Sequence, residues 1–196
     1  MNVFVIRHGE TAWSLSGRHT GTTDVPLTEN GRRRAEQMRP ALKDTDFALV
    51  LVSGAQRARQ TCALAGLGGA AVVDDDLREW NYGQYEGLTP SQIEKLSPGW
   101  LVFRDGCPGG ETPDQVGARA DRVIARAGAV QGNVALFAHG HLLRVLAARW
   151  IGLAPCEGQR LLLDTGRLGI LGDYRGVPAI KIWNAPVDGW GSALRV

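Results

Sequence analysis

Three uninterrupted apolar runs divide the chain, and each is followed by polar residues and then by a stretch with helical spacing. The runs cover residues 3–6, 48–52 and 134–138. Short apolar runs of this kind are typical of strands buried on both faces of a parallel sheet. The repeated order of strand, turn and helix predicts an α/β fold, a three-layer sandwich in which helices flank a mainly parallel sheet.

Two helix starts carry a local sequence signal. Residues 89–92 and 112–115 both read Thr-Pro-x-Gln. Threonine at the N-cap, proline at the first helical position and glutamine at the third form a capping box. The remaining periodicity predicts helices over 28–42, 55–65 and 141–150, and two C-terminal strands over 168–171 and 179–183, joined through 174–176.

Side chains suited to phosphate chemistry follow the predicted strands. Arg7 and His8 come after the first strand, Arg57 after the second and His139 after the third. Ligands of open α/β sheets bind beyond these strand ends, so one shared site is expected. Arginine holds a phosphate dianion with paired hydrogen bonds, and a neutral imidazole can attack phosphorus. A second imidazole, if protonated, would stabilise charge on the transferred group, and Glu79 is the candidate acid for the leaving oxygen.

Five segments around these residues carry a specific resemblance. They read RHGET at 7–11, TGTTDVPLT at 20–28, RARQT at 57–61, LREWNYG at 77–83 and AHGH at 138–141. In this order the segments resemble the motifs of the histidine phosphatase (phosphoglycerate mutase-like) superfamily, and the resemblance spans nearly the whole chain.

The resemblance implies a role for each matching residue. His8 would be the phosphorylated nucleophile, Glu79 the proton donor, and His139 would complete the phosphate pocket with Arg7 and Arg57. Further phosphate contacts are implied for Ser14, Thr20, Gly21 and Gly140, with Ser14 standing where the mutases commonly carry asparagine.

A narrower resemblance concerns the substrate side. Residues 13–14, 105–112 and 138–144 are similar to fungal sedoheptulose-1,7-bisphosphatase and its bacterial relatives. That pattern implies that Tyr82, Arg104 and Arg144 line the substrate, with the two arginines taking the second phosphate of a sugar bisphosphate. The chain of 196 residues has little room for the insertions that close mutase sites against water, which favours hydrolysis.

Other functions remain open at this stage. The leading hypothesis is a phosphatase of small phosphorylated metabolites, and the alternatives are a mutase and a non-catalytic phospho-ligand binder. His139 and His141 have the spacing of a metal-ligand pair, but the neighbouring arginines would repel a cation, so neither a metal nor a cofactor is expected. Glu79 has the alternative of being a surface charge paired with Arg78.

Composition limits the class of partner. A net charge of +2 and a pI near 8.6, without a clustered basic stripe, argue against nucleic acid. No leader peptide and no run of about 20 apolar residues is found, so a cytoplasmic protein that does not enter the membrane is expected. Cys62, Cys107 and Cys156 are too scattered for a disulfide framework. We expect a single domain over 1–196, and the oligomeric state stays undetermined.

Overall fold

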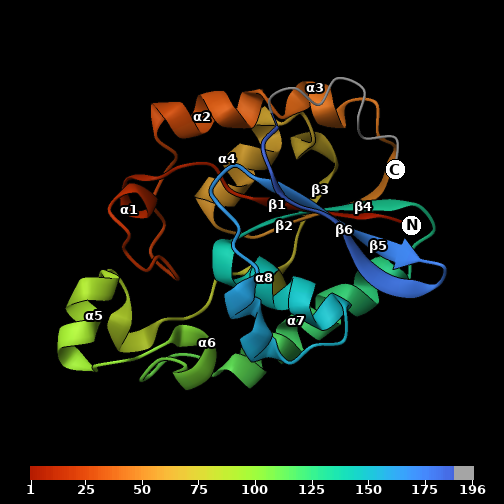
Figure 1. The fold of residues 1–196 in the computed structure, drawn as a ribbon. Coiled ribbons are helices and arrows are strands. Elements are labelled where there is room, and N and C mark those ends of the chain that lie inside the picture. The colour runs from red at the N-terminus through yellow and green to blue at the C-terminus, as the bar shows by residue number, and fades with distance from the viewer. Residues whose placement is uncertain (188–196) are drawn as a thin grey trace.

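The computed structural model of the protein describes residues 1–187, and its centre is a six-stranded sheet with the order β3-β2-β4-β1-β5-β6 (Figure 1). Strands β1 to β4 run parallel, whereas β5 is antiparallel to β1 and to β6. The strands are β1 (Val3–Arg7), β2 (Phe47–Val52), β3 (Ala71–Val73), β4 (Asn133–Ala138), β5 (Leu168–Tyr174) and β6 (Val177–Ala185). The predicted mainly parallel α/β architecture is therefore confirmed.

Helices cover both faces of the sheet (Figure 1). On one face lie α2 (Glu29–Glu36), α3 (Arg39–Leu42) and α4 (Gln56–Leu64), and on the other lie α7 (Pro113–Gly128) and α8 (Gly140–Trp150). Strand residues alternate between the two resulting cores, because successive side chains point to opposite faces. Val3 and Val5 pack into the core beneath α7 and α8, whereas Phe4 and Ile6 pack into the other.

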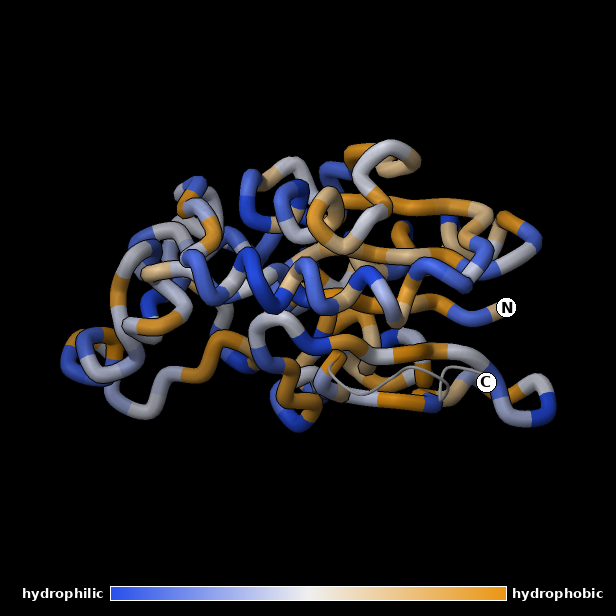
Figure 2. Tube along the Cα trace, turned by 90° about the horizontal axis from the view of Figure 1, so that it is seen from above, coloured by the Kyte–Doolittle hydropathy of each residue, from blue (hydrophilic) through white to orange (hydrophobic). Residues whose placement is uncertain are grey.

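The hydropathy of the chain follows this layering (Figure 2). The strands are mostly hydrophobic, whereas α2, the helix nearest the viewer in Figure 2, is mostly hydrophilic. Only Gly31 and Ala35 of α2 are buried, so small side chains make its contact with the protein interior. Within residues 1–187, no helix combines the length and the apolar character that crossing a membrane requires.

Short elements complete the fold. At the carboxyl ends of β1, β2 and β4 stand α1 (Ala12–Leu15) and α5 (Pro90–Leu96), with α6 (Val102–Asp105) nearby (Figure 1). The 3-10 helices are η1 (Gly68–Ala70), η2 (Asp75–Leu77), η3 (Gly83–Tyr85) and η4 (Pro155–Arg160). Of these segments, α1 and α5 stand above the sheet edge at which the phosphate-binding side chains were predicted.

The helix predicted over 28–42 is divided in two. Helix α2 ends at Glu36, and α3 begins at Arg39 with Pro40 in its first turn. A proline ring lacks the N–H of a helix interior and collides with the carbonyl group four residues earlier, which is that of Glu36. Both predicted capping boxes are confirmed, at Thr89 and at Thr112.

Candidate active site

His8 follows β1 and is buried, with 5% of its surface exposed. Its Nδ1 lies 2.7 Å from the carbonyl oxygen of Gly9. A carbonyl oxygen only accepts, so Nδ1 carries the proton and donates it. Burial, reinforced by the charges of Arg7 and Arg57, holds the pKa of His8 well below its usual value. The ring is therefore neutral at neutral pH and has an unprotonated Nε2, the form that a nucleophile requires.

Arg7 lies against the start of α8. Its Nη1 donates to the carbonyl oxygen of Leu163 at 2.5 Å. Within residues 1–187, the buried Nε of Arg7 has no hydrogen-bond partner. A buried donor without a partner is costly, and Nε lies against Gly140, shielded from the pocket that Arg7 borders. Burial also lowers the pKa of Arg7, and arginine stays charged at neutral pH all the same.

Gly140 has no side chain, and Arg7 occupies the space that a side chain at this position would fill. A Cβ atom at Gly140 would lie 3.0 Å from Cζ and 3.1 Å from Nε of Arg7. We expect Gly140→Ala to displace the guanidinium group and to lower kcat/KM for p-nitrophenyl phosphate about 10- to 100-fold, since small displacements in a site are expensive.

Gly128→Ala is the matched control, because a Cβ atom there meets nothing within 4 Å. Both variants should keep the melting temperature close to that of the wild type, and only Gly140→Ala should lose activity. Full activity of Gly140→Ala would contradict the role given to this contact.

Arg57 lies on α4 and is fully buried. Its four hydrogen bonds go to Nδ1 of His139 (3.2 Å) and to the carbonyl oxygens of Thr20 (3.0 Å), Gly21 (3.1 Å) and Thr23 (3.0 Å). Glu86 accepts the N–H groups of Gly21 and Thr23 from the other side. Arg57 thus holds the loop that carries Thr20, and its guanidinium group is not part of the pocket lining.

His139 stands between Arg57 and Ser53. Because its Nδ1 accepts from Arg57, its Nε2 donates to the hydroxyl of Ser53 at 2.7 Å. The rings of His8 and His139 meet edge to face, with centroids 5.2 Å apart. Burial, followed by the charge of Arg57, holds the pKa of His139 well below its usual value. The imidazole is neutral in this structure, whereas a phosphate dianion beside it would raise that pKa.

Glu79 is buried at the N-terminus of α8, with 8% of its surface exposed. Its carboxylate accepts the backbone N–H groups of Trp80 (2.9 Å), His141 (3.1 Å) and Leu142 (3.0 Å). The positive end of the helix dipole favours a carboxylate at this place. Arg78 pairs with Glu111 at 3.3 Å, so the structure does not support the reading of Glu79 as a surface charge paired with Arg78.

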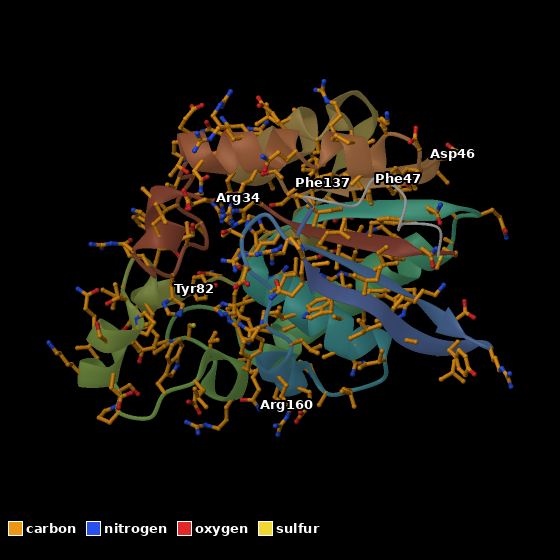
Figure 3. All side chains as sticks on the ribbon, turned by 45° about the horizontal axis from the view of Figure 1, so that its top comes forward. Arg34, Asp46, Phe47, Tyr82, Phe137 and Arg160 are labelled. Carbon is orange, nitrogen blue, oxygen red and sulfur yellow. The ribbon has the colours of Figure 1, made fainter. Side chains whose placement is uncertain are left out.

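Arg7, His8 and Glu79 border a pocket of about 230 Å³. Its lining includes most of the residues predicted from the sequence, namely Arg7, His8, Ser14, Thr20, Glu79, Tyr82, Gly140 and Arg144. It also includes residues that the sequence analysis did not assign to substrate, namely Gly17, Arg18, His19, Pro90 and His141. Arg18 and His19 directly precede the 20–28 motif, and this adjacency is the signal that could have found them. Figure 3 shows Tyr82 between α1 and α5, away from the end of the sheet where Asp46 and Phe47 lie.

Besides Arg57 and His139, which do not line this pocket, three residues predicted to contact phosphate or substrate make other contacts in the structure. The hydroxyl of Ser14 bonds Thr11 in the capping box of α1, although Ser14 borders the pocket. Gly21 lines a neighbouring cavity together with His139, and both its N–H and its carbonyl are bonded within the protein. Arg104 is exposed and pairs with Asp105 at 2.7 Å, outside the lining of the pocket, because this short contact within α6 holds its guanidinium group at the surface.

The two histidines of the HxH motif have separate partners. Tyr82 and Nδ1 of His141 share a hydrogen bond of 2.6 Å, whereas His139 uses both its nitrogens on Ser53 and Arg57. Burial raises the pKa of Tyr82 well above its usual value, so the hydroxyl keeps its proton. Among residues 1–187, no group of three or more histidine, cysteine or acidic side chains is arranged to hold a metal ion.

Comparison with known proteins identifies the family of the chain. A sequence model of the histidine phosphatase superfamily (branch 1) matches residues 3–186. An acid phosphatase of Mycobacterium tuberculosis is 42% identical over an alignment of 184 residues that covers 92% of this chain and 90% of that protein. Sedoheptulose 1,7-bisphosphatase of Saccharomyces cerevisiae is 39% identical, over 78% of this chain and 69% of that protein.

Solved structures agree with the sequence relatives. The product of an open reading frame of Mycobacterium tuberculosis superposes with a TM-score of 0.90 at 40% identity, covering 95% of this chain and 98% of the other. A mycobacterial glucosyl-3-phosphoglycerate phosphatase in complex with VO3 superposes with a TM-score of 0.84 at 29% identity, covering 94% and 98%. The chain belongs to branch 1 of the histidine phosphatase superfamily. Within that superfamily it is a phosphatase, a phosphoric monoester hydrolase.

Proposed function

We propose that the protein hydrolyses phosphate monoesters of small metabolites by passing the phosphoryl group through Nε2 of His8. The observation that carries this proposal is the hydrogen bond of 2.7 Å from Nδ1 of His8 to the carbonyl oxygen of Gly9. It assigns the proton to one nitrogen and leaves the other free as the nucleophile. Arg7 borders the same pocket as His8 and carries a fixed positive charge, so it is the group best placed to hold the phosphate oxygens.

The reaction then proceeds in two transfers. In the first, a P–N bond to His8 forms as the ester P–O bond breaks, and Glu79, which has to enter this step protonated, gives its proton to the leaving oxygen and becomes a carboxylate. In the second, water attacks phosphorus, Glu79 takes a proton from it, and the P–N bond breaks to release phosphate. The place of Glu79 in the pocket wall beside His8 supports one carboxyl group for both proton transfers.

Arg144 supports a substrate with a second anionic group. Its Nε and Nη2 donate to the carbonyl oxygens of Gly158 (3.0 Å) and Gln159 (2.9 Å), and its guanidinium group lies 4.5 Å above the ring of Phe103. These contacts fix the cation where the His8 pocket meets an adjoining cavity of about 370 Å³. The relative from Saccharomyces cerevisiae is named for a sugar bisphosphate, which makes this class the candidate substrate.

Arg144→Ala is expected to raise KM for a sugar bisphosphate about 10- to 100-fold, the loss of one charge-assisted hydrogen bond. Hydrolysis of p-nitrophenyl phosphate, which has no second phosphate, should change little. The sequence predicted the same effect for Arg104→Ala, but the exposed Arg104–Asp105 pair leads us to expect an unchanged KM for that variant. Equal losses of Arg144→Ala on both substrates would exclude a specific contact with the remote phosphate.

A direct assay separates the proposed hydrolase from the two alternatives. Phosphate release is measured on p-nitrophenyl phosphate and on a panel of sugar phosphates and bisphosphates, alongside interconversion of 2- and 3-phosphoglycerate with a bisphosphate primer. We expect phosphate release without interconversion. Interconversion faster than phosphate release would instead establish a mutase. Some relatives at 28–30% identity are named probable phosphoglycerate mutases. Binding without turnover would establish a phospho-ligand binder.

A further inference from the structure

A buried ion pair beside the active site has more hydrogen-bonding groups than its own pairing uses. Arg119 on α7 is 2% exposed, and Glu111, just before that helix, is 9% exposed. Nε and Nη2 of Arg119 donate to the two carboxylate oxygens of Glu111 at 2.8 and 2.9 Å. The cost of removing both charges from water roughly cancels their attraction, so stability alone does not account for such a pair.

The remaining groups of the pair bind one segment, residues 76–81, which carries Glu79, mainly through its backbone and also through the side chains of Arg78 and Trp80. Arg119 donates to the carbonyl oxygens of Asp76 (2.7 Å), Arg78 (3.0 Å) and Glu79 (3.4 Å). Glu111 accepts the N–H of Asn81 on Oε2 (2.9 Å) and the indole N–H of Trp80 on its carbonyl oxygen (2.9 Å). Nearly every polar contact of the pair thus goes to the loop of the proposed acid.

Glu79 is consequently held from two sides. Its side chain accepts N–H groups from His141 and Leu142 at the start of α8, and the backbone of its loop is tied to α7 through Arg119. Helix α7 packs against η2 and α8, so both supports belong to the same layer of the fold. A shift of the loop relative to α7 would move the carboxyl group relative to His8.

We propose that the Arg119–Glu111 pair is a positioning device for Glu79, one that sets the rate of leaving-group protonation without touching the substrate. The inference rests on the proposed role of Glu79 as the proton donor. The proposed positioning role belongs to Arg119 and not to Arg122 on the same helix. Arg122 is exposed and binds the same segment only through the side chain of Asp76.

The test compares two substrates in Arg119→Lys. Lysine keeps the charge opposite Glu111. Its single nitrogen cannot replace the three nitrogens of the guanidinium group, which bind Glu111 and the loop carbonyl groups at the same time. We expect kcat/KM for glycerol 2-phosphate, an alkyl phosphate, to fall about 10- to 100-fold, because misplacing a catalytic group is costly. We expect kcat/KM for p-nitrophenyl phosphate, whose leaving group needs little protonation, to fall less than about threefold. In Glu79→Gln, adding Arg119→Lys should cause no further loss on glycerol 2-phosphate.

Arg122→Lys is the matched control, because it makes the same change one turn further along α7. It should leave the ratio of the kcat/KM values for the two substrates unchanged. Should Arg119→Lys fail to fold, Glu111→Gln provides the same selective readout. Equal losses on both substrates, or no loss at all, would overturn the positioning role while leaving the phosphatase assignment intact. If Glu79→Gln itself lowers kcat/KM equally for both substrates, Glu79 is not the proton donor, and the inference fails with it.

Discussion

His8→Ala is expected to reduce kcat to the background rate, a loss on the order of 10⁴- to 10⁶-fold, as when a covalent nucleophile is removed. The reason lies in the geometry around the ring. Nδ1 of His8 donates to Gly9, and burial beside Arg7 and Arg57 keeps the ring neutral, so Nε2 is the prepared nucleophile. Without the ring there is no atom at this place to accept the phosphoryl group.

The intermediate gives an independent measurement. Wild-type protein quenched during turnover of a ³²P-labelled substrate should carry an acid-labile label, and His8→Ala should carry none. His19→Ala is the useful comparison, because it removes another imidazole from the same pocket and should retain the label. A label that persists in His8→Ala would move the nucleophile to another residue.

Glu79→Gln is expected to lower kcat/KM for glycerol 2-phosphate by about 10²- to 10⁴-fold, the usual contribution of a general acid. The loss on p-nitrophenyl phosphate should be far smaller, because nitrophenolate leaves without a proton. Glutamine keeps one oxygen as the acceptor for the N–H groups of Trp80 and Leu142, so the loop retains two of its three side-chain contacts.

The ratio of kcat/KM for glycerol 2-phosphate to kcat/KM for p-nitrophenyl phosphate decides the outcome, because a folding defect lowers both values together. Thermal unfolding of Glu79→Gln should be recorded in parallel, to measure the effect of the lost contact with His141. Equal losses on both substrates at an unchanged melting temperature would assign the proton transfer to a different group.

Several features of the fold could be predicted from the sequence because their causes are local. Uninterrupted apolar runs identified β1, β2 and β4, and the Thr-Pro-x-Gln pattern located the starts of α5 and α7. Strand β3 was not predicted, because it is a three-residue edge strand in which Val72 and Val73 stay more than half exposed. Its pairing with β2, rather than a periodicity of its own, makes it a strand.

The residues that follow the strands could also be assigned to one site, because parallel strands bring their carboxyl ends to the same edge of the sheet. His8 and His139 indeed meet there, with ring centroids 5.2 Å apart. The sequence did not show, however, which arginines face the pocket and which bind other parts of the protein. Arg57 is turned toward the carbonyl groups of the 20–23 loop, and Arg104 toward Asp105, whereas Arg7 and Arg144 border the pocket.

Motif and strand order together specify which residue types stand at one sheet edge, and with them which chemistry this protein contains. Which of these side chains are free to act depends on how the layers of the fold pack. Each guanidinium, imidazole and carboxylate group is surrounded by acceptors and donors from distant parts of the chain, as Arg119 and the 76–81 loop show across about 40 positions. Because hydrogen-bond partners of this kind are fixed only when layers of the fold pack together, no local pattern encodes them.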